Sequence, residues 1–279
     1  MIVSLRMIIQ FFCISLSYIK TIFHAEFIIH CDKILLYNKR DINLNSGFYK
    51  DLDTNFEQAC DLCEREFSHE ELLSMLKNGN IPQKQIAALK LDSVENEEEA
   101  AILLDNLTGC DGKIREAVAL KIYRILSENQ QGLFSKLNPK VFADATIDIN
   151  ANICRLVVDS VRLLKQDTDF AHKYIEYVQQ YIIQALDELD KFIFRDKKYV
   201  INKQLFKLYW CLEALKYFYE LVDEKLMLDI LKRSAAQSEY TVREKAAEIA
   251  ILSEKFAEIQ NLLRQDSNYY VRAVFLKSS

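Results

Sequence analysis

Apolar residues recur three and four positions apart through most of the chain from Asn55 onward, which is the spacing of one face of an α-helix. Ser68 and Glu71 form a capping-box pattern before one such stretch, and Asn96 and Glu99 form another. This periodicity, repeated with short polar connections, predicts an all-α fold. A clear example of the stripe is Ile114, Ala117, Val118, Ile122, Ile125 and Leu126.

Two neighbouring segments are longer than the others. Residues 169–194 and 198–222 each have the pattern of a helix of about seven turns. The polar run Arg195–Lys198 connects them. We therefore expect a long antiparallel helical hairpin at about 169–222, between two blocks of shorter helices.

Within those blocks a short pattern repeats. Val242-Arg243 follows a small polar turn and is followed by Ala246 and Ala247, and Ile114-Arg115 is followed in the same way by Val118 and Ala119. Val271-Arg272 is a third copy, 29 residues after the first of these. A looser copy has Lys84 in place of the arginine, and another, with one extra residue, ends at Arg155. Self-similarity of this length is typical of stacked helical repeats.

This pattern resembles the HEAT repeat over roughly residues 69–166 and 224–279. The resemblance implies an α-solenoid of two-helix units, with the long hairpin as a departure from it. It also implies an arginine near the start of the second helix of each unit, paired with an acidic residue of an adjacent unit. We interpret four residues as structural repeat positions of this kind: Arg115, Arg155, Arg243 and Arg272.

Residues 1–45 differ from the rest of the chain, residues 46–279. Met1–Tyr18 is apolar, with Arg6 as its single early charge, but the run is short for a membrane span. Four interpretations stand: a signal peptide, a membrane anchor, an extra capping helix, or an extension from a misplaced start codon. We favour the last because the repeating pattern begins only near Asn55.

The composition narrows the function classes. Gly 5 and Pro 2 are few for hairpin-rich sheets or glycine-rich phosphate loops. A net charge of −5 argues against sequence-independent binding to nucleic acid, which requires a positive field. Seven scattered cysteines in a chain of 279 residues favour reduced thiols and a cytoplasmic location. The alternative location is a membrane, reached through residues 1–20.

One group of residues has the types that bind metals. Cys60 and Cys63 have the Cys-x-x-Cys spacing, and His69 follows. A zinc site usually has a second pair of ligands, and the sequence lacks one. Cys60 and Cys63 also fall on one helix face with Phe56 and Phe67, so we interpret them as small apolar side chains and predict no metal and no cofactor.

The long hairpin is rich in aromatic residues interleaved with lysines. Most of these rings are expected to pack the hairpin against itself and its neighbours. Phe206, Trp210 and Tyr217 lie off the aliphatic stripe of the second helix, which gives that helix a second contact surface. We predict these three residues as partner-binding residues, with an intramolecular contact as the alternative.

Two function classes follow. The preferred one is a non-catalytic scaffold of HEAT-like repeats that binds another protein, because stacked repeats leave an extended surface. The alternative is an enzyme on the same architecture, similar at the level of fold to the HEAT-like alkylpurine DNA glycosylases or the phycobilin lyases. No residue of the chain is predicted to be catalytic.

Overall fold

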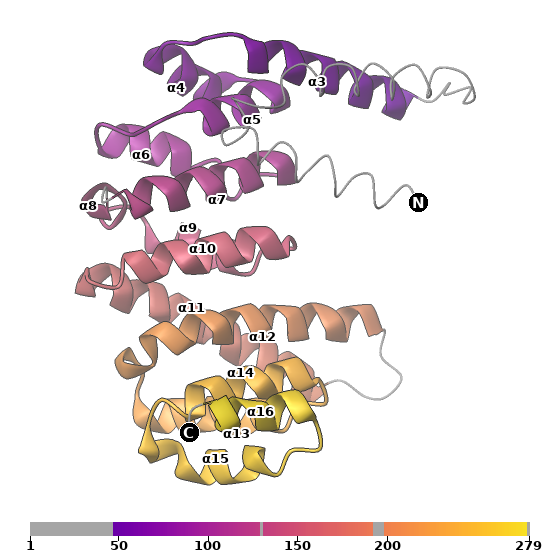
Figure 1. The fold of residues 1–279 in the computed structure, drawn as a ribbon, viewed down its shortest axis with the longest axis vertical. Coiled ribbons are helices and arrows are strands. Elements are labelled where there is room, and N and C mark those ends of the chain that lie inside the picture. The colour runs from indigo at the N-terminus through magenta and orange to yellow at the C-terminus, as the bar shows by residue number, and fades with distance from the viewer. Residues whose placement is uncertain (1–46, 129–130, 192–197, 278–279) are drawn as a thin grey trace. The chain divides into compact units, whose positions relative to one another are not determined.

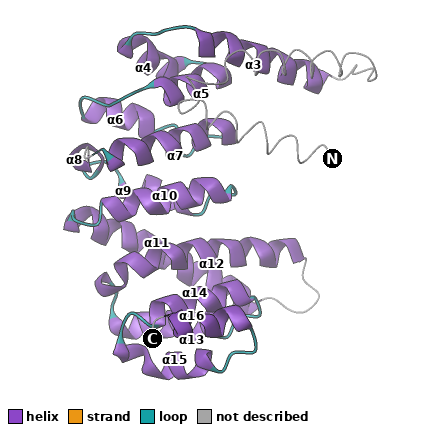
Figure 2. Cartoon of the chain, in the orientation of Figure 1, coloured by secondary structure: helices purple, strands orange, loops and turns teal. Residues whose placement is uncertain are grey.

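The structure is a computed structural model that describes residues 47–128, 131–191 and 198–277. Every regular element within these ranges is a helix, and no strand occurs in them (Figure 2). The all-α prediction is therefore confirmed. The four interpretations of residues 1–45 concern residues that lie outside the described ranges.

Contacts divide the chain into two compact units, Met1–Thr54 and Asn55–Ser279. Helix α3 spans Gly47–Glu64, so it begins before Asn55, where the sequence pattern had placed the start of the first helix. The packing described below is internal to the unit Asn55–Ser279.

The helices that follow are mostly short, apart from one central pair. The first group is α4 (His69–Asn78), α5 (Ile81–Lys90), α6 (Glu97–Leu104), α7 (Gly112–Ser127), α8 (Gln131–Phe134), α9 (Pro139–Thr146) and α10 (Ala151–Leu163). The central pair is α11 (Thr168–Lys191) and α12 (Lys198–Phe218), and the 3₁₀ turn η1 (Tyr219–Leu221) follows it. The last group is α13 (Glu224–Ala235), α14 (Tyr240–Ala250), η2 (Glu254–Phe256), α15 (Ala257–Arg264) and α16 (Tyr269–Lys277).

Side-chain caps define several of the helix starts. The Ser68 hydroxyl accepts a hydrogen bond from the Glu71 amide, and the Glu71 carboxylate accepts one from the Ser68 amide at 2.7 Å. The predicted capping box is thus confirmed. Asn80 and Gln83 form a second box at α5, with Pro82 in the first turn of that helix. A capping box satisfies amide groups that the helix leaves without a partner.

Gly79 connects α4 to α5 without space for a side chain. Its amide donates to the Met75 carbonyl at 2.8 Å, so the backbone turns tightly against the end of α4. A Cβ atom at this position would collide with the Met75 carbonyl oxygen and would lie 2.8 Å from the Gln83 Cβ. The close approach of the two backbones therefore requires glycine here.

Most helices of this unit, from α4 onward and apart from the short α8, form two sets. In one set, α5, α7, α10, α12, α14 and α16, each helix packs against the next one named (Figure 1). We call this set row B. Helices α4, α6, α9, α11, α13 and α15 form row A, in which α4 packs on α6, α9 on α11, α11 on α13, and α13 on α15. Val242 and Val271, whose patterns first indicated a repeat, are both fully buried and lie on the adjacent helices α14 and α16.

The long hairpin predicted at about 169–222 is present as α11 and α12, which pack extensively against each other. An aromatic chain joins it to the preceding helices. Phe142 of α9 meets Phe170 of α11 edge-on, with ring centroids 5.5 Å apart. Tyr174 then contacts Phe170 and the α12 residue Phe218, and its hydroxyl lies 2.8 Å from the Thr146 hydroxyl. The hairpin is therefore part of the core, not a separate projection.

None of the helices in the described ranges combines the length and the apolar character that crossing a membrane requires.

Candidate functional site

Two of the predicted repeat arginines join successive row B helices by the same contacts. Arg115 donates from Nε and Nη2 to the Asp148 carboxylate at 2.6 and 3.2 Å. Arg243 donates from the same two atoms to Asp266 at 2.7 and 3.0 Å. All four side chains are largely buried, with exposed fractions between 8% and 12%. Each pair is therefore a bidentate, charge-assisted contact with little access to water.

The two aspartates also fix the start of the next row B helix. Asp148 accepts a hydrogen bond from the Asn150 amide at 2.8 Å, and Asp266 accepts one from the Asn268 amide at 2.7 Å. Asn150 is the N-cap of α10, and Asn268 directly precedes α16. One carboxylate thus binds an arginine of one helix and orients the beginning of the next helix.

We call the residue four positions after the helix N-cap the linking position. It is occupied by Lys84, Arg115, Cys154, Arg243 and Arg272 in α5, α7, α10, α14 and α16. Nη1 of each arginine binds the carbonyl six residues before it, and the Cys154 thiol lies 3.1 Å from the carbonyl of Asp148, also six residues before it. The linking position is therefore defined by the helix start and not by residue type.

Arg155 is not a linking residue, which differs from the prediction. Its side chain is exposed, and its hydrogen bond goes to Asn152 of its own helix at 3.4 Å. Cys154 takes the linking position, where burial raises the pKa of its thiol to about 12. The thiol stays protonated at neutral pH and can donate to the carbonyl of Asp148. Arg155 is one residue later, and one residue turns a helix by about 100°.

The first linking residue uses a neutral partner. Lys84 donates from Nζ to the Asn106 side chain at 2.9 Å. Asn106 is buried and donates in turn to the carbonyls of Leu76 and Ile102. This amide joins α4, α5 and α6, so the lysine copy of the pattern also makes contacts between helices.

The predicted partner-binding residues lie together on α12, each with a partly exposed side chain. Phe206 meets Trp210 edge-on, with ring centroids 6.4 Å apart. Tyr209, between them in sequence, meets Trp210 at 5.2 Å. Trp210 and Tyr217 also pack against the core, whereas Phe206 does not. The aromatic cluster is therefore anchored at Trp210 and more open at Phe206.

Cations lie against two of these rings. Arg162 of α10 and Lys216 of α12 place their charged groups 5.3 and 5.1 Å from the centre of the Tyr217 ring. Lys245 of α14 lies 5.3 Å from the centre of the Tyr209 ring. Cation–π contacts of this kind fix the rings relative to three consecutive row B helices.

The same lysines belong to a charged network that the sequence analysis missed. Glu213 of α12 pairs with Lys216 at 2.8 Å and with Lys245 at 2.7 Å. Glu248 of α14 pairs with Lys216 at 2.9 Å and with Lys245 at 3.0 Å. We call the network, together with Phe206, Tyr209, Trp210 and Tyr217, the α12–α14 surface. The only local signal was the i, i+3 spacing of Glu213 with Lys216 and of Lys245 with Glu248.

These pairings hold the network in its charged form. Burial alone raises the pKa of Glu213, but Lys216 and Lys245 lower it more, so that the net shift is downward. Burial lowers the pKa values of the two lysines, but the ion pairs with Glu213 and Glu248 raise them above the usual value. With two carboxylates and two ammonium groups, the four side chains are together neutral.

The indole N–H of Trp210 is a buried donor that belongs to this surface. No acceptor within the described ranges binds it. Burying such a donor costs about 1–3 kcal/mol.

The cysteines and histidine considered as metal ligands do not converge. Cys60 and Cys63 on α3 are exposed, so the prediction that they fill an apolar face is wrong. His69 binds the Glu99 carboxylate at 2.9 Å, and this hydrogen bond raises the pKa of the imidazole. Nowhere in the part of the chain that the structure describes do three or more potential metal ligands lie together.

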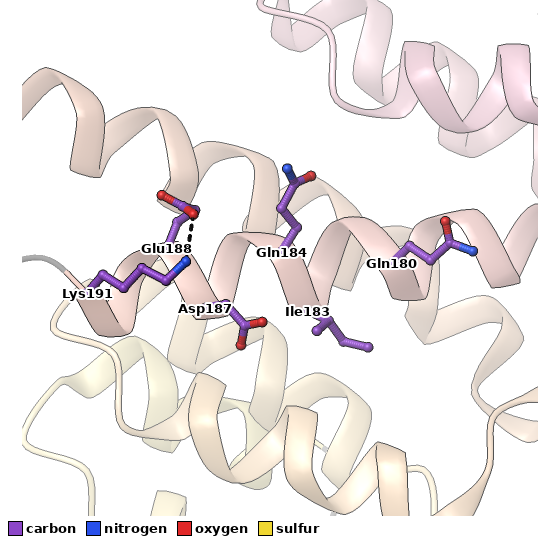
Figure 3. A pocket seen from close by; sticks show the side chains of 6 residues that line it. All are labelled: Gln180, Ile183, Gln184, Asp187, Glu188 and Lys191. Carbon is purple, nitrogen blue, oxygen red and sulfur yellow. Dashed lines mark hydrogen bonds and ion pairs between the residues drawn. The ribbon is translucent and has the colours of Figure 1, made fainter.

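A shallow depression of about 330 Å³ lies along α11. Figure 3 shows its side chains, all from this one helix, with Lys191 paired to Glu188. Asp187 forms an ion pair with Arg233 of α13. Ligand sites usually combine polar groups from several elements around an apolar pocket, and this depression does not. Its lining residues are Gln180, Ile183, Gln184, Asp187, Glu188 and Lys191.

Comparison with known proteins leaves the family open. No protein-family model and no curated protein matches the chain. Among solved structures, the chain is similar to a crystal structure described as an engineered protein, a structural-genomics target. The two share 14% sequence identity, with a TM-score of 0.37, over 76% of this chain and 95% of the other.

Proposed function

We propose that the chain is a HEAT-like α-solenoid that acts as a non-catalytic scaffold and binds another protein through the α12–α14 surface. The observation that carries this proposal is the composition of that surface. Aromatic rings that are only partly buried lie beside paired charges on adjacent helices of row B. Aromatic side chains anchored in this way are typical of binding hot spots.

The repeated arginine contacts support the solenoid part of the proposal. The Asp148 and Asp266 carboxylates each connect a row B helix to the next one through a buried bidentate contact. Repeating the same connection between successive units is how a stacked array extends while each unit contacts only its neighbours.

The protonation behaviour supports binding over acid–base chemistry. A general acid or base works best when its pKa lies near the working pH. On the α12–α14 surface the Glu213 pKa moves downward and those of Lys216 and Lys245 move upward, because the opposite charges stabilise one another. These shifts suit a fixed, charged recognition surface.

The partner we propose is a protein and not nucleic acid, and the location is the cytoplasm. The network contributes no net positive charge, and the whole chain carries a net charge of −5. Binding to phosphate backbones needs an excess of Lys and Arg on the contact face. Exposed thiols such as that of Cys110 also fit a reducing compartment.

The test is affinity capture followed by quantitative mass spectrometry with three forms of the full chain. The surface variant combines Phe206→Ser with Tyr217→Leu, which keeps apolar bulk where Tyr217 packs on the core. The control variant combines Gln180→Ser with Gln184→Ser on row A. A protein retained by the wild type and the control but lost by the surface variant is the expected result, followed by direct binding of the purified pair.

Two results would contradict the proposal. One is the same set of captured proteins for all three forms. The other is saturable binding to labelled duplex DNA that persists at about 0.15 M salt, which would favour the alternative of a DNA-base glycosylase.

A further inference from the structure

The last row B helix, α16, leaves uncovered a position that is buried in α5, α7, α10 and α14. Four residues after the linking position stand Ala88, Ala119, Val158, Ala247 and Leu276. The first four are at most 2% exposed, because the neighbouring helices cover them. Leu276 of α16 is 70% exposed. A large apolar side chain therefore stands at a position where the chain otherwise places a small, covered one.

The arginine of the same helix makes only half of the usual contacts. Arg272 donates from Nη1 to the carbonyls of Asp266 and Ser267 at 2.6 and 2.8 Å, as Arg243 does to the turn before its own helix. Nε and Nη2 of Arg243 bind Asp266 of the next unit. Within the described ranges, no carboxylate binds Nε or Nη2 of Arg272, so two donors in a fixed planar group remain available.

An aromatic ring completes the pattern. Tyr240, the first residue of α14, stacks on Tyr270, the second residue of α16, with centroids 5.9 Å apart. Tyr269 is the first residue of α16 and so corresponds to Tyr240, and it is 62% exposed. The Tyr269 ring meets that of Tyr270 edge-on, with centroids 5.7 Å apart, and most of its surface stays open to a further ring.

We propose that this surface, which we call the α16 surface (Tyr269, Arg272 and Leu276), binds a helix of a partner protein that begins after an aspartate-containing turn. The junction between α14 and α16 is the template. The partner aspartate would accept hydrogen bonds from Nε and Nη2 of Arg272, as Asp266 does from Arg243. An aromatic residue at the second position of the partner helix would stack on Tyr269, and its apolar face would cover Leu276.

The partner segment thus has a defined order: Asp, any residue, a capping Asn, any residue, and then an aromatic residue that is the second residue of an amphipathic helix. Asp266–Tyr270 has this sequence. The α16 surface shares no residue with the α12–α14 surface, so this proposal does not depend on what that surface binds.

The test uses a labelled peptide that copies residues 253–277, titrated with the full chain and followed by fluorescence anisotropy. We expect saturable binding that weakens about tenfold or more when the peptide aspartate at 266 is changed to Asn, because the bidentate contact is lost. Arg272→Met and Leu276→Ser in the full chain should weaken binding to a similar extent. Ile149→Ser removes an apolar side chain elsewhere that is even more exposed than Leu276, and it should leave binding unchanged.

A second form of the test does not require the free peptide to fold. A copy of residues 253–277 is added to the full chain after Lys277, and unfolding by urea is measured with Asp or Asn at the copied position 266. The proposal requires the Asp form to raise the midpoint for α16 unfolding above that of the Asn form. It is overturned if the added copy leaves the midpoint unchanged, or if the peptide binds equally well with Asp and Asn.

Discussion

Arg115 and Asp148 illustrate what a single buried contact does in this chain. Both side chains are about 9% exposed, and Asp148 also holds the Asn150 amide at the start of α10. Taking two charges out of water is costly, so the pair stabilises the fold only while both members are present. Removal of one member leaves the other as a buried, uncompensated charge.

We therefore expect Asp148→Ala to lower the free energy of unfolding by about 3–5 kcal/mol. Arg115→Met combined with Asp148→Leu should cost less than the two single changes added together, because no charge is left alone. Urea unfolding of the wild type, Arg115→Met, Asp148→Leu and the double variant measures this coupling.

Glu97→Ala is the matched control, because the Lys136–Glu97 pair has side chains 61% and 53% exposed. An exposed pair contributes about 0–1 kcal/mol. Equal losses from Asp148→Ala and Glu97→Ala would contradict a linking role for Asp148.

The contact between Arg243 and Asp266 predicts how the free energy of unfolding depends on pH. The hydrogen bond from Arg243 lowers the pKa of Asp266 below its ordinary value of 3.8. A carboxyl whose pKa is lowered by folding adds stability above its unfolded pKa, and this contribution is lost as the pH falls through the folded value. The wild type should therefore lose stability more steeply than Asp266→Asn between about pH 5 and pH 2. Parallel pH profiles of the unfolding free energy would show that the contact does not form.

The sequence identified the linking arginines Arg115 and Arg243, but in α10 it pointed to Arg155 and not to Cys154, which takes the linking position. A residue pattern shows which side chains can form a helix face, but the linking position is counted from the helix N-cap, here Asn150. That count reaches Cys154, whose thiol would not be expected to replace a guanidinium. The sequence therefore gave no reason to prefer it.

At the scale of helices and their connections, Gly79 shows how a short turn sets the distance between two neighbours. The backbone before α5 approaches the end of α4 so closely that a Cβ atom would collide with the Met75 carbonyl oxygen. Steric crowding against backbone is relieved only by moving one helix relative to the other.

Gly79→Ala is expected to lower the free energy of unfolding by about 1–3 kcal/mol because α4 and α5 must separate. Gly109→Ala is the control, since a Cβ atom there has no neighbour within 4 Å. That change should alter stability by about 0.5 kcal/mol or less. Thermal or urea unfolding of both variants measures the two losses of stability. Equal losses for Gly79→Ala and Gly109→Ala would mean that the turn at Gly79 is not tightly packed.

The arrangement of the helices also explains why the sequence predicted the aromatic residues of the α12–α14 surface but not its charged network. Phe206, Trp210 and Tyr217 lie on one helix, so their shared position off the aliphatic stripe was visible in the sequence. Lys245 and Glu248 lie on α14, and their contacts with α12 exist only because these helices are adjacent. Helical periodicity describes one element at a time and contains no information on that adjacency.

Across the unit Asn55–Ser279, each helix of row B contacts its neighbours in the row, and the arginine–aspartate contacts join successive helices. In the solenoid proposed above, stability would be the sum of terms within repeat units and between adjacent repeat units. A change at one end should therefore affect the nearest helices and leave distant ones unaltered.

Hydrogen exchange of a chain that ends at Leu252, compared with the full chain, tests this arrangement most directly. Removal of α15 and α16 uncovers the buried side of α14 and frees Arg243 from Asp266. We expect faster exchange of backbone amides in α13 and α14 and unchanged exchange in α5 and α7. Loss of protection in α5 and α7 as large as that in α14 would contradict an arrangement in which each helix depends only on its neighbours.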